Sequence, residues 1–237
     1  MNRRIALSRI AGLTVAAAGV ATTVNGAPDT ASREISVAER RMFVDDQLRS
    51  LPPTATLEYT LTKRGSLEPG FEDHAIIRVG APRASGGRPV HMDVRSQAPD
   101  AAMPDLEAAT GNPIILFFLE RDVREMHRLT GGSPNHFRQR IRLALASHAE
   151  VVPVAVTAGT RQVSAVEIRI APYRDDPVRT RYERFAEKSY AFTLSNDVPG
   201  EVVEMRSEVL APDAASRDAP GILIAEELRF ARMRSGE

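Results

Sequence analysis

The amino-acid sequence predicts an α+β fold in which a curved antiparallel β-sheet of about eight strands forms a half-barrel. Segments with alternating apolar and polar residues lie on both sides of a central stretch, as is typical of half-buried strands. The central stretch, residues 112–146, instead has apolar residues at helical spacing. A further segment of helical periodicity precedes the first strand. We therefore expect a sheet with an inserted helical hairpin and an N-terminal helix.

The first helix of the hairpin contains six consecutive apolar residues, Ile114 to Leu119. Asn112 followed by Pro113 is typical of a helix start, because the Asn side chain accepts a hydrogen bond from the first turn and Pro suits the first helical position. We expect the helix to end near Gly131, with a glycine in the left-handed conformation. A helix that is apolar all round in its first turns must be enclosed on several sides.

A second hairpin helix and a leading helix are also expected. Ser133-Pro134 repeats the start signal, although residues 140–145 also alternate, so a strand remains the alternative there. Ser36 and Glu39 have the spacing of a capping box, which predicts a leading helix over roughly residues 37–50. Its apolar face is predicted to consist of Val37, Val44, Leu48 and Leu51.

The strands are predicted from alternation and from the turn residues between them. Residues 97–110 are expected to form a surface loop, and Pro153 places its strand at an edge or bulge. Asp176-Pro177 is expected to start a short helix through residue 185. The expected strands cover residues 57–61, 72–79, 90–94, 151–157, 163–173, 189–194, 201–209 and 222–230.

Residues 1–27 are expected to be an export signal and residues 28–237 a single periplasmic β-rich domain with the helical insert 112–146. Arg3, Arg4 and Arg9 precede an apolar run, residues 10–24, that is too short to span a bilayer well. Cleavage is expected after Gly26 or Ala27. The ordinary secretory route is favoured, and twin-arginine export, suggested by residues 2–7, is the alternative.

Composition excludes several classes of function. The sequence has no cysteine, which excludes disulfides, thiol catalysis and thiolate metal sites. It contains 31 basic and 31 acidic residues, and removal of the signal leaves 28 basic against 31 acidic, a net charge of −3. This near-neutrality argues against a nucleic-acid partner. No stretch after the signal is long and apolar enough to span a membrane.

This layout resembles the periplasmic lipoprotein-carrier fold of the Lol type and related curved-sheet envelope domains of unknown function. The features that carry the resemblance are the export signal, the leading helix from Val37, and the strands that flank the insert from Gly111 to Ala146. Carriers of that type shield acyl chains in an apolar concave cavity under a helical lid. The resemblance implies passive shielding of a ligand, but it is architectural and transfers no contact residue.

The apolar side of the insert is the candidate ligand site. A void beneath a helical lid would bury an acyl chain or another apolar ligand, and this burial would stabilise the complex by ~25 cal/mol per Å² of apolar area. The alternative is that the same side chains fill the half-barrel as a packed core. The candidate ligand-binding residues are Ile114, Ile115, Phe117, Phe118, Val123 and Met126.

The hairpin also carries six arginines against three acidic residues, a local charge of +3. Arg121, Arg124 and Arg128 are expected opposite the face of Val123 and Met126, where they would contact lipid head groups or an acidic partner. The alternative is a solvated helix face with i,i+4 ion pairs, and the pairs expected there are Glu120–Arg124 and Arg121–Glu125.

No catalytic residue, metal site or cofactor is assigned. The histidines show no metal-binding spacing, and nucleophile-elbow and phosphate-loop motifs are absent. Asp175 and Asp176 are candidates for cation or acid–base chemistry, but a helix cap accounts for Asp176. The five histidines are His74, His91, His127, His136 and His148.

We expect a non-enzymatic, soluble, exported protein that binds or carries an apolar ligand, a lipid or a lipidated protein by passive shielding. One alternative is a structural or assembly factor that binds another envelope protein. An enzyme whose site is assembled only in space is the third, since such sites leave no linear trace.

Overall fold

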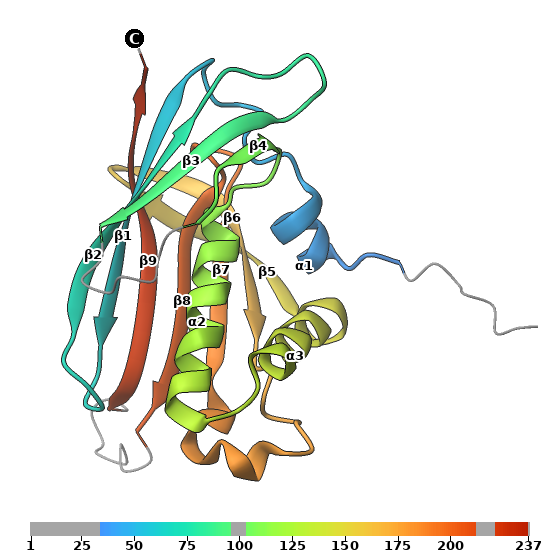
Figure 1. Cartoon of the computed structure of the whole chain (residues 1–237), viewed down its shortest axis with the longest axis vertical. Coiled ribbons are helices and arrows are strands. Elements are labelled where there is room, and N and C mark those ends of the chain that lie inside the picture. The colour runs from blue at the N-terminus through green and yellow to red at the C-terminus, as the bar shows by residue number, and fades with distance from the viewer. Residues whose placement is uncertain (1–33, 96–102, 212–220, 237) are drawn as a thin grey trace, which may run out of the picture. The chain divides into compact units, whose positions relative to one another are not determined.

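The computed structural model describes residues 34–95, 103–211 and 221–236, so the predicted export signal lies outside the described residues. Nine antiparallel strands form one open sheet in the order β4-β3-β2-β1-β9-β8-β7-β6-β5 (Figure 1). The strands are β1 (Ala55–Arg64), β2 (Phe71–Val79), β3 (Arg88–Arg95), β4 (Leu106–Ala109), β5 (Glu150–Ala158), β6 (Arg161–Ile170), β7 (Ser189–Leu194), β8 (Val202–Leu210) and β9 (Ile222–Ser235).

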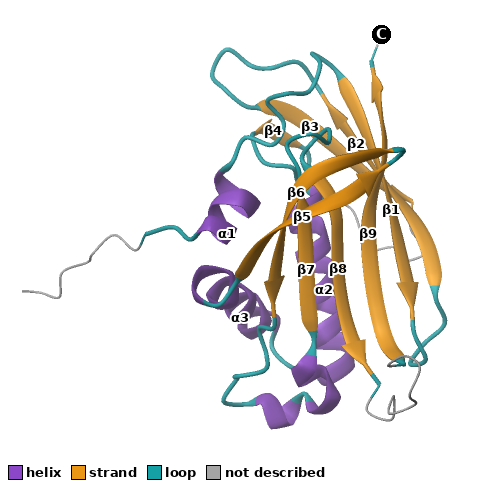
Figure 2. Ribbon diagram, turned by 180° about the vertical axis from the view of Figure 1, so that it is seen from behind, coloured by secondary structure: helices purple, strands orange, loops and turns teal. Residues whose placement is uncertain are grey.

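The helices are short apart from the inserted hairpin. The sheet curves around α2, which lies against its inner face, as both views show (Figures 1 and 2). The helical elements are α1 (Val37–Glu39), its continuation η1 (Arg40–Val44, a π-helical turn), α2 (Ile114–Thr130), α3 (Pro134–Ser147), and the 3₁₀ turns η2 (Arg179–Arg181) and η3 (Glu183–Glu187).

The predicted α+β class and the inserted hairpin are confirmed. The Asn112 side-chain oxygen accepts a hydrogen bond from the Ile114 amide at 3.2 Å, and Gly131 ends α2 in the left-handed conformation with φ 69°. The strand alternative for residues 140–145 is wrong, because α3 runs through them. Pro153 lies in β5, which is an edge strand as expected.

Two expectations are corrected. The sheet has nine strands rather than about eight, because residues 106–109 of the expected loop pair with β3 as β4. The leading helix ends at Val44 rather than near residue 50, since Asp45 adopts an extended conformation. The Gln47 side chain then donates a hydrogen bond to the Arg41 carbonyl at 2.7 Å and stabilises this early end.

The early end of the helix changes which apolar residues it buries. The predicted inward residues Val37 and Val44 are 61% and 53% exposed, whereas Met42 is buried at 2%. Beyond the helix the chain turns so that Leu48 and Leu51 enter the core. Two of the four predicted inward residues therefore face outward, which places apolar surface beside the hairpin.

Candidate functional site

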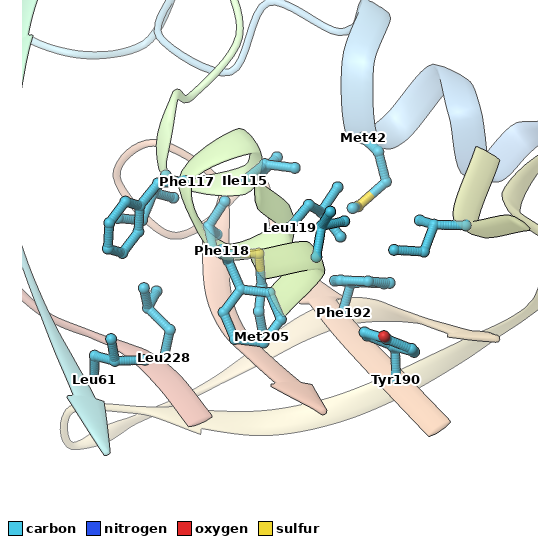
Figure 3. Close-up of a cluster of buried hydrophobic side chains, with 14 of the residues drawn as sticks. Met42, Leu61, Ile115, Phe117, Phe118, Leu119, Tyr190, Phe192, Met205 and Leu228 are labelled. Carbon is cyan, nitrogen blue, oxygen red and sulfur yellow. The ribbon is translucent and has the colours of Figure 1, made fainter. Parts of the chain in front are cut away.

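Side chains of α2 fill the concave side of the sheet. Phe117 and Phe118 are each 1% exposed, and Figure 3 shows them pointing toward Leu61, Leu228 and Met205 of the sheet. This close contact of large side chains is the packing of a protein core. All six predicted ligand residues (Ile114, Ile115, Phe117, Phe118, Val123 and Met126) are 0–1% exposed and belong to this core. Their contact with a ligand stays a prediction.

A buried polar network holds the second half of α2 to the sheet. Asp122 is 1% exposed and accepts hydrogen bonds from Lys188, from the Tyr190 hydroxyl at 2.5 Å and from the Ser207 hydroxyl at 2.9 Å. Lys188 is itself 3% exposed, so both charges of this ion pair are withdrawn from water. Burial raises the pKa of Tyr190 well above its usual value, which keeps its hydroxyl a donor.

Two further carboxylates at the contact between α2 and the sheet have opposite pKa shifts. Glu226 of β9 is 3% exposed and accepts a hydrogen bond from Arg121 at 3.2 Å, and burial raises its pKa. Its second oxygen has no hydrogen-bond partner among the described residues. Burial would also raise the pKa of Glu125, but hydrogen bonds from Arg128 and Lys63 outweigh it and lower that pKa to about 2.

The three arginines predicted to meet head groups do not share one face. Arg121 contacts the sheet instead of facing away: its guanidinium lies 5.0 Å from the centre of the Phe71 ring and pairs with Glu226. The predicted Arg121–Glu125 pair is therefore replaced by one across the α2–β9 interface. Arg124 and Arg128 are exposed, as expected. Contact of these arginines with head groups stays a prediction.

An apolar groove lies outside the packed core, between the N-terminal helix, α2 and α3. Four large apolar side chains that line it are 41–53% exposed: Ile35, Phe43, Val44 and Leu116. Its buried wall includes Val123, the one predicted ligand residue that lines it, together with Leu119 and Ile141. The groove has a volume of about 460 Å³. We call it the helix groove.

Local hydrogen bonds fix the walls of the helix groove. Ser36 and Glu39 form the predicted capping box, which starts α1. The Ser36 hydroxyl also donates to the Leu145 carbonyl at 2.9 Å and ties α1 to α3. The Asn112 amide donates to the Gln47 side chain at 2.7 Å and ties the start of α2 to the chain after η1. Three segments distant in sequence are thus held around one apolar hollow.

The rim of the helix groove is charged on both sides. Glu120 of α2 accepts two hydrogen bonds from Arg138 of α3, both at 2.7 Å, and this pairing lowers the pKa of Glu120. Arg142, one turn further along α3, is exposed and has no ion-pair partner in the part of the chain that the structure describes. The rim therefore carries one cation that is available for an anionic group.

The short helix predicted from Asp176 to residue 185 is replaced by the 3₁₀ turns η2 and η3, and Asp176 is the N-cap of neither. Its carboxylate instead accepts a hydrogen bond from the Val178 amide at 2.9 Å. The same carboxylate bonds His136 at 2.7 Å, which places this histidine in a structural contact. Within residues 34–95, 103–211 and 221–236, no three His, Asp or Glu side chains converge on a point where they would hold a metal ion. No helix of this described part is both long and apolar enough to span a membrane.

No protein-family model matches this chain, and no curated protein matches it. Among solved structures, the chain is similar to the Mycobacterium tuberculosis lipoprotein LppX, with 8% identity and a TM-score of 0.34, over 84% of this chain and 94% of that chain. It is similar to a LolA superfamily protein from Nitrosomonas europaea, with 7% identity and a TM-score of 0.22, over 84% and 94% of the two chains.

A third similar structure is an outer membrane lipoprotein-sorting protein domain from Vibrio parahaemolyticus, with 9% identity and a TM-score of 0.23, over 77% and 85% of the two chains. The names of the second and third structures are of the lipoprotein-sorting type that the sequence resembles. The fold of this chain is defined by its own strand order and register.

Sequence reasoning missed the helix groove and the network around Asp122. The groove needs Val44 to face outward, and this depends on where the helix ends. Asp122 and Lys188 are 66 residues apart in the chain, so no local pattern joins them. A signal for the network was present in the sequence, because Asp122 is a carboxylate directly beside Val123 on the side of α2 that is otherwise buried through apolar residues.

Proposed function

We propose that this protein binds an acyl chain with an anionic head group, from a lipid or a lipidated protein, and shields it passively in the helix groove. The observation that carries this proposal is the gathering of exposed apolar surface. Seven large apolar side chains of the described residues are exposed, and four of them line this one groove. Apolar surface gathered in this way marks a binding site more often than scattered residues do.

The size and charge of the groove support the same ligand class. Its volume of about 460 Å³ falls within the roughly 300–1,000 Å³ of small-molecule sites. Each methylene buried there contributes about 0.8 kcal/mol, roughly a fourfold gain in affinity. Arg142 at the rim supplies a cation for a carboxylate or phosphate head group. No reacting group is needed, so the proposed role is non-enzymatic.

A chain-length series tests this proposal. Binding of octanoate, dodecanoate and hexadecanoate is measured by calorimetry, and affinity is expected to rise with chain length until the groove is filled. Leu116→Ser is expected to lower the affinity for dodecanoate roughly tenfold or more, because burial of one leucine side chain contributes about 1.5–3 kcal/mol. Leu210→Ser is the matched control, since Leu210 is as exposed as Leu116 but lies on β8, outside the groove.

The head-group part is tested separately with Arg142→Gln. This variant is expected to bind dodecanoate more weakly than the wild type and to bind the uncharged dodecanol with unchanged affinity. If Leu116→Ser and Leu210→Ser bind dodecanoate as the wild type does, the acyl-chain proposal is wrong.

The proposed compartment is the periplasm. The expected export signal, with arginines before an apolar run at residues 10–24, supports this placement. Cell fractionation with an antibody to the folded domain tests it, and a full-length form that stays in the cytoplasm would contradict it.

The assembly-factor alternative has one observation in its favour. The edge strand β5 is nine residues long and pairs on one side only, with β6. Exposed edges accept strands from partners, although Pro153 removes one donor. Capture of an envelope protein by cross-linking from β5, without bound acyl chain, would favour this role.

A further inference from the structure

The outer face of the sheet, turned away from α2, carries a second groove of different chemistry. Leu57 and Tyr59 of β1 are buried on the inner side, so alternation turns Glu58 outward. Ala231 of β9 is an unpaired extra residue next to this point, a bulge that increases the local twist. The resulting hollow has a volume of about 710 Å³.

Arginines dominate this hollow, which we call the arginine groove. Its charged lining consists of Arg78, Arg95, Arg232, Arg234 and Glu58. The register places Arg78 of β2 and Arg234 of β9 on either side of Thr56, about 10 Å apart at the backbone. Arg95 of β3 lies opposite His74, which is four residues before Arg78 on β2. The backbones of Arg95 and Arg78 are therefore about 14 Å apart.

The cations in the arginine groove are only partly neutralised. Both carboxylate oxygens of Glu58 are already paired, with Arg232 at 2.7 Å and with Arg234 at 2.5 Å. Arg78 and Arg95 are exposed, and neither has an ion pair within the described parts of the chain. Four guanidinium groups and one carboxylate give the lining a charge of +3.

The neighbouring acidic residue reduces this charge without removing it. Asp93 of β3 pairs in register with Ile76 but is not part of the lining, and it lowers the local charge to +2. The guanidinium groups that line this groove carry like charges and repel one another. A bound anion would relieve this repulsion, because the guanidinium fork fits phosphate and carboxylate oxygens in pairs.

The lining of the arginine groove is too polar to suit an acyl chain. Thr56 and Thr60 add hydroxyl donors, and no exposed large apolar side chain of the described residues lines this groove. We propose that the arginine groove binds a phosphate-bearing ligand with at least two anionic groups. One group lies between Arg78 and Arg234, and the second lies toward Arg95. This site is independent of the helix groove, because the two lie on opposite sides of the sheet.

Calorimetric titration with inorganic tripolyphosphate at low salt tests the proposal. The double variant Arg78→Gln/Arg95→Gln is expected to bind at least tenfold more weakly than the wild type. Glu58→Gln is expected to bind several-fold more tightly, because it releases Arg232 and Arg234. The matched control is Arg161→Gln/Arg181→Gln, which removes the same charge from exposed positions outside the groove and is expected to bind within twofold of wild type.

A second arm distinguishes a soluble phosphate ligand from lipid head groups. Sedimentation with phosphatidylglycerol vesicles is measured for the same variants, after circular dichroism has shown that each is folded. Loss of tripolyphosphate binding alone in the double variant assigns a soluble ligand, and loss of vesicle binding assigns head groups. The proposal is overturned if the wild type binds neither tripolyphosphate nor vesicles. It is also overturned if Arg78→Gln/Arg95→Gln binds both probes no more weakly than its control, Arg161→Gln/Arg181→Gln.

Discussion

The two halves of α2 are buried against the sheet by different means. The first half contributes Phe117, Phe118 and their apolar neighbours to a close-packed core. The second half also packs apolar side chains there, but in addition it carries Asp122 and Glu125, whose partners come from β1, β7, β8, α2 itself and Lys188 just before β7. Apolar packing tolerates many arrangements of similar volume, whereas each buried charge requires a partner at one position. The ionic half therefore fixes the rotation and register of a helix that the apolar half holds in place.

Asp122→Ala is expected to cause the largest loss among the substitutions that separate these two halves. It leaves Lys188 buried without its counter-charge, which costs about 3–5 kcal/mol of unfolding free energy, measured by urea denaturation. The double variant Asp122→Leu/Lys188→Met removes both charges and is expected to recover much of this loss. A loss below about 1 kcal/mol for Asp122→Ala would show that the ion pair does not hold α2.

Adjacent residues on α2 give the next test, because one belongs to the core and the other to the helix groove. Ile115 is 1% exposed and Leu116 is 49% exposed. Ile115→Ala is expected to lower the unfolding free energy by about 2–5 kcal/mol through a core cavity. Leu116→Ala is expected to change it by no more than about 0.5 kcal/mol. Equal losses in thermal and urea unfolding would contradict the separation of core from groove.

A smaller loss than for Asp122→Ala or Ile115→Ala is expected at Glu125, and it depends on pH. Since its folded-state pKa is lowered from 4.5 to about 2, the stability it contributes is present above pH 4.5 and is lost as the pH falls toward 2. Allowing for solvent screening at this partly exposed group, Glu125→Gln should cost about 1–2 kcal/mol at neutral pH.

Glu226→Gln serves as the control for this pH dependence. Burial raises the pKa of Glu226 in the folded state. The contribution of Glu226 to the unfolding free energy therefore falls as the pH rises through the ordinary value of 4.5 toward the raised pKa. Glu226→Gln has no ionisable group at this position, so this decrease is absent in the variant. Urea denaturation from about pH 2 to neutral pH gives the unfolding free energy of the wild type minus that of each variant. This difference is expected to rise with pH below 4.5 for Glu125→Gln and to fall with pH above 4.5 for Glu226→Gln, and changes of the same sign would contradict the assignment.

The parts of the fold that the sequence predicts are those with local causes. Asn112-Pro113 and Gly131 set the ends of α2 through their own backbone and side chain, and alternation sets the inner and outer faces of the strands. The end of the first helix at Val44 depends on Gln47 and on its hydrogen bond to the Asn112 amide, a tertiary contact that periodicity does not contain.

The candidate site was less accessible to prediction than the fold. The apolar run of α2 correctly indicates enclosure, yet its residues fill the half-barrel, and the exposed apolar surface lies on its other side at Leu116. Ile35 and Ile141 join Leu116 only after α1 and α3 have packed. Similarly, Arg78 and Arg234 come together through strands at opposite ends of the sequence. Such sites depend on pairing order, which composition and spacing do not specify.

Photolabelling with a diazirine-bearing fatty acid, followed by mass spectrometry of the labelled residues, tests the central claim most directly. If the acyl chain binds outside the packed core, labels are expected at Phe43, Val44 and Leu116, and competing dodecanoate should remove them. Labels at Leu61, Phe118 or Met205 would instead place the ligand beneath α2 and contradict the claim that the helix groove is the binding site.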